Sequence, residues 1–205
     1  SLKDWRETLE IDYLKTDIPD LSKETKEGLD RVRKIVADLK NFSRPDSTHE
    51  WQDADIHAGI ESTLNVIHNE VKYKADVIKD FGPMPLIQCL PSEINQVIMN
   101  LVVNAAHAMG DQRGHITIRT RALGNEALIE VEDDGSGMPE ATLAKIFDPF
   151  FTTKPVGQGT GLGLSLSYGI IKKHGGHIDV DSQEGRGTRF SIHIPIRQPA
   201  VAATA

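Results

Sequence analysis

The chain of 205 residues has a single cysteine, Cys89, and no long apolar run. One cysteine excludes a framework of internal disulfides and is typical of a reducing compartment. No stretch approaches the roughly 18 apolar residues of a membrane span, and no signal peptide is recognisable. Low-complexity segments are also lacking. We therefore expect a cytoplasmic chain without membrane contact of its own, even where a parent protein carries a membrane anchor.

An excess of positive charge is lacking as well. Lys and Arg number 23 and Asp and Glu 30, which leaves a net charge of −7 and makes a general nucleic-acid surface unexpected. Apolar residues make up 39% of the chain, enough for a core. The length accommodates one ordinary domain and an appendage. Cys89 stands in the apolar phrase PLIQCL and is interpreted as a small core residue.

The first 45 residues differ in kind from the rest. Around Pro19 a helix either restarts, with Asp17 as its cap, or continues with a kink. Within residues 21–44 apolar residues repeat at heptad-like spacing opposite a charged face. These positions are Leu29, Val32, Ile35, Val36, Leu39 and Phe42. Nothing in the segment itself buries so narrow a stripe, so we expect a homodimer through this helix. The alternative is a helix folded back on its own domain.

A mixed α/β pattern follows the predicted helix. A proline after its basic end makes residues 46–52 a predicted linker, before a domain at 53–197 and a tail at 198–205. Strands are predicted at 54–56, 76–81, 85–90, 115–122, 127–132, 177–182 and 188–195, and helices at 57–70, 92–109 and 161–173. The expected fold class is α+β. It is a two-layer α/β sandwich, a mixed and mainly antiparallel sheet with helices on one face, preceded by a long α-helix.

Three phrases in the second half of the chain together describe an ATP pocket. They are QVIMNLVVNAAHAM at 96–109, VEDDGSGM at 131–138 and GQGTGLGLSLS at 157–167. The last supplies backbone N–H groups at a helix N-terminus, where phosphate binds well. The second supplies a carboxylate that can accept a hydrogen bond from an adenine amine. The first supplies neutral amide oxygens, which suit Mg²⁺.

The spacing of the asparagines places them together. Asn100 and Asn104 are four residues apart, so both project from one face of a helix. His107 lies one turn further on, either as a donor to phosphate or as a surface histidine. After Asp133, two glycines, Gly135 and Gly137, allow the backbone to turn tightly.

In these motifs, residues 90–195 resemble the ATP-binding catalytic domain of bacterial sensor histidine kinases. This domain belongs to the superfamily shared with gyrase, the Hsp90 chaperones and MutL. The matching motifs are NLVVNA at 100–105, DDGSG at 133–137, FDPFF at 147–151, GQGTGLG at 157–163 and GRGT at 185–188. Residues 24–44 are similar to the second helix of the kinase dimerisation hairpin. The resemblance implies a Bergerat-type ATP-binding fold.

The resemblance also implies a role for each matching residue. ATP and Mg²⁺ would be the cofactors, with Asn104 as the metal ligand and Asn100 beside it as the catalytic pair. Asp133 would accept from the exocyclic amine of adenine, supported by the hydroxyl of Thr188, and Asp134 would face away from the base. The other nucleotide-binding positions implied are His107, Gly135, Gly137, Met138, Lys154, Gly159, Thr160, Gly161, Leu162 and Gly163.

Prolines and glycines between residues 147 and 163 predict a lid without fixed regular structure. Lys154 is placed to reach the phosphates. Phe147, Phe150 and Phe151 would hold one end of the lid against the core, or serve in plain core packing.

Asn100 also bears on the reaction. Hydrolases of the superfamily carry a Glu at this position, where it activates water, and an amide cannot act as a base. Transfer to a histidine on a helical hairpin, and from there to an aspartate of a response-regulator receiver domain, is therefore the favoured function. A hydrolytic ATPase of the gyrase–Hsp90 type and a non-catalytic nucleotide-binding scaffold are the alternatives.

No histidine of the chain matches the acceptor of the family. The only His-Glu pair, His49-Glu50, lies in the linker, and the first hairpin helix is missing from the pattern. We therefore expect the chain to bind Mg-ATP without labelling itself. Surface positions account for the histidines His57, His68, His174 and His177.

Overall fold

The computed structural model describes residues 15, 17–26, 28–29, 50–155 and 159–198. They belong to two units, Ser1–Arg44 with Thr152–Thr160, and Pro45–Phe151 with Gly161–Ala205. In the first unit residues 15, 17–26 and 28–29 are helical and exposed. Asp17 is itself helical and therefore does not cap a helix that starts after it. Leu29 is exposed, and the other predicted heptad positions lie outside the described residues.

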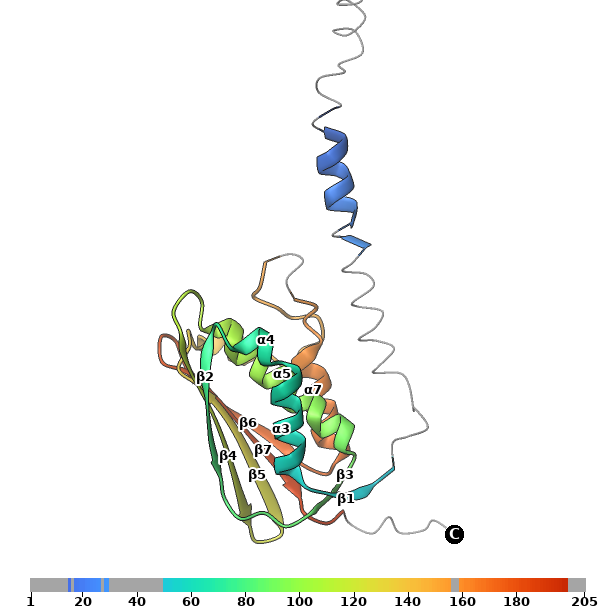
Figure 1. Ribbon diagram of the computed structural model, residues 1–205, viewed down its shortest axis with the longest axis vertical. Coiled ribbons are helices and arrows are strands. Elements are labelled where there is room, and N and C mark those ends of the chain that lie inside the picture. Colours follow the sequence, from blue (N-terminus) through green and yellow to red (C-terminus); the bar gives the residue numbers. More distant parts are fainter. Residues whose placement is uncertain (1–14, 16, 27, 30–49, 156–158, 199–205) are drawn as a thin grey trace, which may run out of the picture. The chain divides into compact units, whose positions relative to one another are not determined.

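Five strands of the second unit build its main sheet in the order β2-β4-β5-β7-β6 (Figure 1). They are β2 (Ala75–Phe81), β4 (Gly114–Leu123), β5 (Glu126–Asp133), β7 (Gly187–Pro195) and β6 (His177–Gln183). Only β2 and β4 pair in parallel; the other three pairs of neighbours are antiparallel. The short strands β1 (Gln52–Ala54) and β3 (Ile87–Cys89) form a separate antiparallel pair.

The helices of this unit cover one face of the sheet (Figure 1). They are α3 (Ile56–Val66), α4 (His68–Val71), α5 (Pro91–Ala108), α6 (Glu140–Leu143) and α7 (Gly163–Lys173). Asp55 caps α3 by accepting hydrogen bonds from the N–H groups of His57 and Ala58. Pro91 opens α5, where its missing N–H costs nothing. The two-layer α/β sandwich and its mixed, mainly antiparallel sheet are as predicted.

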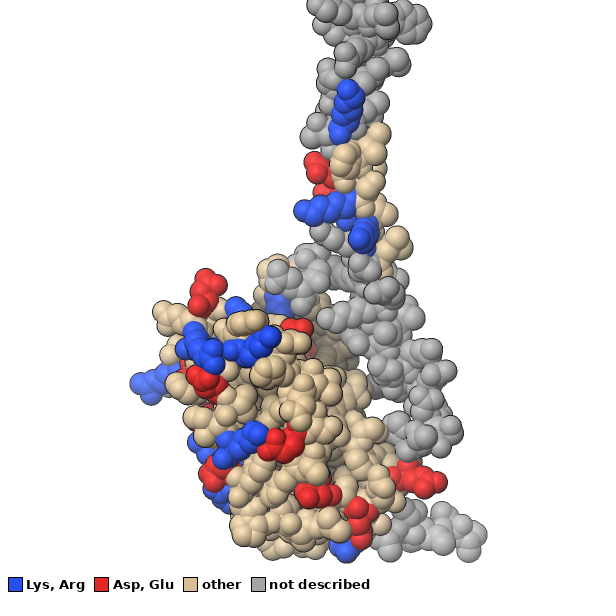
Figure 2. Space-filling model, in the orientation of Figure 1, with Lys and Arg blue, Asp and Glu red and all other residues tan. Residues whose placement is uncertain are grey.

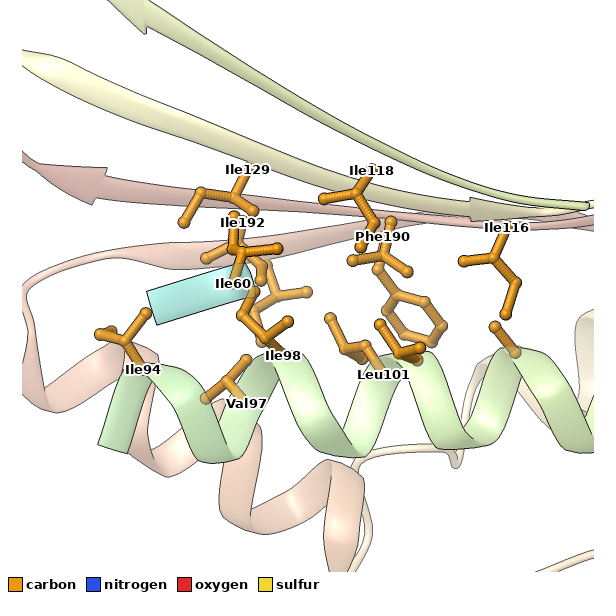
Figure 3. Packing of buried hydrophobic residues seen from close by; sticks show 14 of the residues in the cluster. Ile60, Ile94, Val97, Ile98, Leu101, Ile116, Ile118, Ile129, Phe190 and Ile192 are labelled. Atoms are coloured by element: carbon orange, nitrogen blue, oxygen red, sulfur yellow. The ribbon is translucent and has the colours of Figure 1, made fainter. Parts of the chain in front are cut away.

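The core lies between α5 and the sheet (Figure 3). Ile98 and Leu101 of α5 are at most 1% exposed, as are Ile118 and Ile129 on the facing strands. Truncation of such a side chain to Ala costs about 2–5 kcal/mol, so this layer anchors the unit. Cys89 is also buried, as predicted, and burial raises the pKa of its thiol to about 11. Among the described residues no helix has the length and apolar character needed to cross a membrane.

Several predicted boundaries are wrong. Of the strand at 54–56 only Ala54 is in β1, because Asp55 caps α3 and Ile56 begins it. The helix at 57–70 ends at Val66, and Ile67 separates it from α4. The helix predicted at 161–173 begins two residues later in the structure, at Gly163, because Gly161 has a left-handed backbone with φ of 69°. The predictions also lack α6.

Two histidines assigned to the surface are packed instead. His174 is fully buried and bridges two segments. Its Nδ1–H donates to the carbonyl of Ile170 at 2.8 Å, and its Nε2 accepts from the N–H of Leu90 at 3.1 Å. His57 is half-buried, stacks on Phe81 with ring centroids 4.6 Å apart, and lies 2.8 Å from the hydroxyl of Thr120.

Loss of the His174 imidazole should destabilise the unit. His174→Ala leaves the buried N–H of Leu90 without its acceptor and opens a cavity, so we expect a loss of about 2–4 kcal/mol in the free energy of unfolding by urea denaturation. The exposed His68 of α4 is the matched control, and His68→Ala should change stability by less than about 0.5 kcal/mol.

The pH dependence of stability distinguishes the titration of the His174 imidazole from the effect of its packing. Burial lowers the pKa of His174, so the folded protein keeps it neutral where the unfolded chain is already protonated. The stability that the neutral imidazole contributes is fully present above about pH 6.5 and is lost as the pH falls below that value. His174→Gln keeps an acceptor but does not titrate, so its stability should fall less steeply between about pH 6.5 and 5. Equal slopes in the two proteins would contradict this assignment.

Candidate nucleotide-binding site

Asp133 is the last residue of β5 and lies opposite Thr188 of β7. Both residues are buried, each with 6% exposure. Asp133 Oδ1 accepts a hydrogen bond from the N–H of Gly135 at 3.0 Å. Burial raises the pKa of Asp133 to about 6, although the backbone N–H groups of Gly135 and Thr188 oppose that rise. A carboxylate so poorly solvated gains from any further donor that a ligand brings.

The glycine turn after β5 is held between α5 and the β6–β7 hairpin. The N–H of Ser136 donates to the carbonyl of Ala108 at 2.9 Å, and the Ser136 carbonyl accepts from the N–H of Gly185 at 2.7 Å. A Cβ at Gly135 would lie 2.8 Å from the carbonyl of Ala108, and one at Gly137 would overlap the carbonyl of Gln183. The glycines are therefore required by close packing of the backbone on both sides.

Sequence reasoning missed Ser182, which organises the far side of this turn. Its Oγ accepts from the N–H of Met138 at 2.9 Å and donates to the carbonyl of Gly187 at 3.1 Å. The hydroxyls of Ser182 and Thr188 lie 2.9 Å apart. The two residues are direct partners across the β6–β7 hairpin, so the hairpin register was the signal that could have revealed Ser182.

Near the middle of α5, Asn100 contacts the start of α7. Asn100 Nδ2 donates to the carbonyl of Gly163 and to Ser167 Oγ, each at 3.2 Å. Ser167 is fully buried and donates to the same carbonyl at 2.9 Å. Sequence reasoning missed Ser167 too. Leu162 occupies the N-cap position of α7, and an apolar side chain cannot accept hydrogen bonds from the first-turn N–H groups.

Helix α5 thus spans the site. Asn100 touches the start of α7 and Ala108 touches the glycine turn, with Asn104 midway. Each interval of four residues is about 6 Å along the helix axis. Asn104 is half-buried, and His107 is exposed in the last turn. The predicted residues of the first two motifs and of the α7 start therefore meet along one helix.

Three predicted residues of the lid lie in the other unit. Lys154, Gly159 and Thr160 belong to Thr152–Thr160, where the N–H of Lys154 donates to the hydroxyl of Thr152 at 3.2 Å. Their part in the site stays a prediction. Residues 156–158 lie outside the described chain.

The phenylalanines before the lid differ from one another. Phe147 packs against the core, with its ring centroid 5.1 Å from that of Tyr168. Phe150 is 59% exposed, so the prediction that its side chain packs against the core is wrong. Its backbone is left-handed, with φ of 68°, and its N–H donates to the carbonyl of Gly161 at 2.9 Å. A side chain in that region is strained, which the contact with Gly161 offsets.

Asp134 turns to the neighbouring strand. It accepts from the N–H of His115 at 2.7 Å and pairs with His115 Nδ1 at 2.9 Å. Partial burial would raise the pKa of Asp134, but the hydrogen bonds and charge of His115 lower it below its usual range. The two adjacent carboxyl groups therefore have pKa values shifted in opposite directions.

Residues 89–198 match the family described as histidine kinase-, DNA gyrase B-, and HSP90-like ATPase. The chain belongs to this ATPase family. The resemblance to the ATP-binding domain of sensor histidine kinases is therefore confirmed, and membership implies that the domain uses a nucleotide.

Several proteins in this ATPase family are similar to the chain over most of its length. The sensor kinase CckA of Brucella abortus (strain 2308) is 39% identical over an alignment of 188 residues, and the match covers 83% of this chain and 20% of CckA. Sporulation kinase E of Bacillus subtilis (strain 168) is 35% identical over 178 residues, 84% of this chain and 23% of that kinase. The chain thus spans less than a third of the length of either curated relative.

Solved structures of the ATPase family agree with the fold. The catalytic domain of the histidine kinase ThkA has a TM-score of 0.65 and 33% identity, over 73% of this chain and 97% of that domain. Full-length ShkA, solved in complex with AMPPNP, has a TM-score of 0.69 over 84% of this chain and 36% of ShkA. At 20% identity, the likeness to ShkA shows the fold alone.

Asp133→Asn should stabilise the unliganded protein at neutral pH. Because the pKa of Asp133 is raised to about 6, its ionised form opposes folding above that pH. The variant lacks this penalty, so we expect a gain of about 1–3 kcal/mol in unfolding free energy at neutral pH. The gain should vanish as the pH falls from about 6 to 4, where Asp133 is protonated in both states.

Asp134→Asn is the matched control, with the opposite sign. The folded state favours ionised Asp134, so this variant should be less stable than the parent at neutral pH, and the deficit should shrink in acid. The two substitutions remove the same charge at adjacent positions. Stability changes of the same sign in both variants would contradict the assignment of the buried carboxyl to Asp133.

Gly187→Ala should disrupt the site. Gly187 has φ of 100°, and a Cβ there would overlap the carbonyl of Asp133. Gly185, two residues away with φ of 76°, has open space around it. Gly185→Ala should cost only the left-handed conformation, about 1–2 kcal/mol, and Gly187→Ala considerably more. Thermal unfolding of both variants measures the difference, and equal losses would show that contact with Asp133 does not matter.

Proposed function

We propose that this chain is the ATP-binding kinase domain of a two-component sensor histidine kinase. In this function it transfers the γ-phosphate of Mg-ATP to a histidine on a helical hairpin, for relay to a response-regulator aspartate. The observation that carries the proposal is the placement of α5, which contacts the α7 start at Asn100 and the glycine turn at Ala108. Membership of the ATPase family and similarity to sensor kinases support it.

Asp133 provides the adenine end of the proposed site. Its buried carboxylate can accept from the exocyclic amine, while Thr188, directly opposite on β7, supplies a hydroxyl beside it. Gly135 and Gly137 bring backbone rather than side chains against the ring. Met138, half-buried and fixed through its N–H to Ser182, lines the same turn.

The start of α7 provides the phosphate end. The N–H groups of Gly161, Leu162 and Gly163 precede or open a helix of 11 residues, and the apolar side chain of Leu162 at the N-cap position makes no capping hydrogen bond. A helix terminus of this kind favours an anion. We assign the lid positions Lys154, Gly159 and Thr160 to the β- and γ-phosphates. The exposed His107, in the last turn of α5, is proposed as a further donor to phosphate.

Asn104 is proposed as the protein ligand of Mg²⁺. Its amide oxygen is a hard, neutral donor, and it lies on α5 midway between the proposed adenine and phosphate contacts. One such ligand fits Mg²⁺, which is commonly held by one or two protein oxygens together with phosphates and water. The ion would neutralise charge on the phosphates during transfer.

Asn100 favours transfer over hydrolysis. Its side-chain N–H groups are directed to Gly163 and Ser167, and an amide cannot take a proton from water. The nearest carboxylate on α5, Glu93, pairs with Lys173 at 2.7 Å and lies about 16 Å along the helix from Asn104. We therefore infer an acceptor supplied by a protein. Homodimerisation through the N-terminal helix, an acceptor hairpin and a receiver domain are the proposed partners.

The test combines the chain with a separately supplied kinase hairpin that carries its acceptor histidine. Radiolabelled ATP and Mg²⁺ should give acid-labile phosphohistidine on the hairpin. Asn104→Ala removes the proposed metal ligand and should lower the rate by at least about 100-fold, since metal and positioning supply most of the catalysis in phosphoryl transfer. Asn65→Ala, at an exposed position of α3, is the control and should leave the rate unchanged.

Two outcomes would overturn the proposal. Steady release of inorganic phosphate over many turnovers, without hairpin labelling, would favour the hydrolytic ATPase. Absence of Mg-ATP binding in calorimetry, with the protein folded by circular dichroism, would favour a non-catalytic scaffold.

A further inference from the structure

A second cluster of polar side chains lies on the sheet face opposite the helices. His177 and Asp179 of β6 and His193 of β7 each place one potential metal-binding atom within 4.8 Å of the other two. Their strand neighbours Ile178 and Ile192 are buried against the helices. Because side chains alternate along a strand, the three polar side chains face solvent together.

The sheet register creates this cluster. His177 and His193 are direct cross-strand partners, and their rings stack with centroids 4.4 Å apart. Their Nε2 atoms lie 3.5 Å and 3.8 Å from Asp179 Oδ2. Two ligand atoms on a tetrahedral Zn²⁺ are about 3.3 Å apart, given Zn–N distances near 2.0 Å. Two of the three separations already approach that value, and rotation of the parallel rings would aim both nitrogens at one ion.

A carboxylate, that of Glu126, lies near the Nδ1 side of the His193 ring. Glu126, at the start of β5, places its Oε2 3.9 Å from His193 Nδ1. Histidines that bind metals usually direct their other ring N–H at a carboxylate, which fixes the tautomer and strengthens the ligand. The His193 side chain is only 19% exposed, so its ring lies mostly among neighbouring residues.

We propose that His177, Asp179 and His193 bind a divalent transition-metal ion such as Zn²⁺, with Glu126 as a positioning residue. Two imidazoles and one carboxylate suit Zn²⁺, whereas Mg²⁺ and Ca²⁺ prefer oxygen ligands alone. Three protein ligands leave the fourth position of a tetrahedral ion to water.

This site is separate from the proposed nucleotide site. Thr188 and His193 are five residues apart on β7, about 17 Å, and their side chains lie on opposite faces of the sheet. Metal binding here would join β6 to β7, and β6 is the edge strand of the sheet. Figure 2 shows acidic and basic side chains interspersed on the visible face of this unit.

The test titrates the full 205-residue chain, free of nucleotide, with ZnCl₂ in a calorimeter at neutral pH. We expect one ion per chain. His193→Gln and Asp179→Asn each remove a ligand and should weaken binding by at least about 100-fold. Glu126→Gln keeps all three ligands, so it should weaken binding by about tenfold without changing the stoichiometry. Zn²⁺ should raise the midpoint of thermal unfolding in the parent chain and not in the ligand variants.

The chain offers a matched control in His115, which pairs with Asp134 on the surface. His115→Gln removes a histidine beside a carboxylate in a place where the described residues supply no third ligand, and it should leave Zn²⁺ affinity unchanged. Circular dichroism establishes that each variant is folded. Unchanged affinity in His193→Gln, equal binding of Mg²⁺, or one ion per two chains would each overturn the site.

Discussion

Helix α5 must satisfy two sets of partners, and the rest of the second unit is arranged around that requirement. Its apolar side packs against β4, β5 and β7 of the sheet, where truncation of a side chain leaves a cavity. Its polar side meets the α7 start at Asn100 and the glycine turn at Ala108. Any rotation that improved one set of contacts would disturb the other. The core therefore fixes the distance between the two ends of the site without help from a ligand.

The burial of Asp133, on which its proposed selectivity for adenine rests, also costs stability. A carboxylate at the surface would exchange water for a ligand donor with little net gain, because water is an equally good partner. At 6% exposure Asp133 has little such solvation, and this burial is the main cause of its raised pKa. The backbone N–H groups of Gly135 and Thr188 compensate only in part. Stability given up here is supplied by the isoleucine-rich layer below.

Sequence patterns predicted the parts of the site that depend on local chemistry. Asn100 and Asn104 follow from helical spacing, and Asp133, Gly135 and Gly137 from the needs of a tight turn after a strand. The patterns did not show which residues face each other when strands pair or helices pack. Ser182 lies beside Thr188 because the β6–β7 hairpin pairs them, and Ser167 reaches Asn100 because α7 packs on α5. His174 was assigned to the surface for a related reason: a polar residue before Gly-Gly is typical of a surface turn, and the contacts with Trp51 and Leu90 that bury it are tertiary.

The alternation of side chains along β7 lets one strand serve two purposes. Thr188 faces the helices beside Asp133, whereas His193 faces solvent beside His177 and Asp179. Strand β7 has neighbours on both sides, β5 and β6, whereas β6 has a neighbour on one side only. An ion on the outer face would therefore act mainly on how firmly the edge strand β6 is held. Because β6 carries Ser182, whose Oγ holds Met138, a firmer β6 would tighten the glycine turn rather than reshape it.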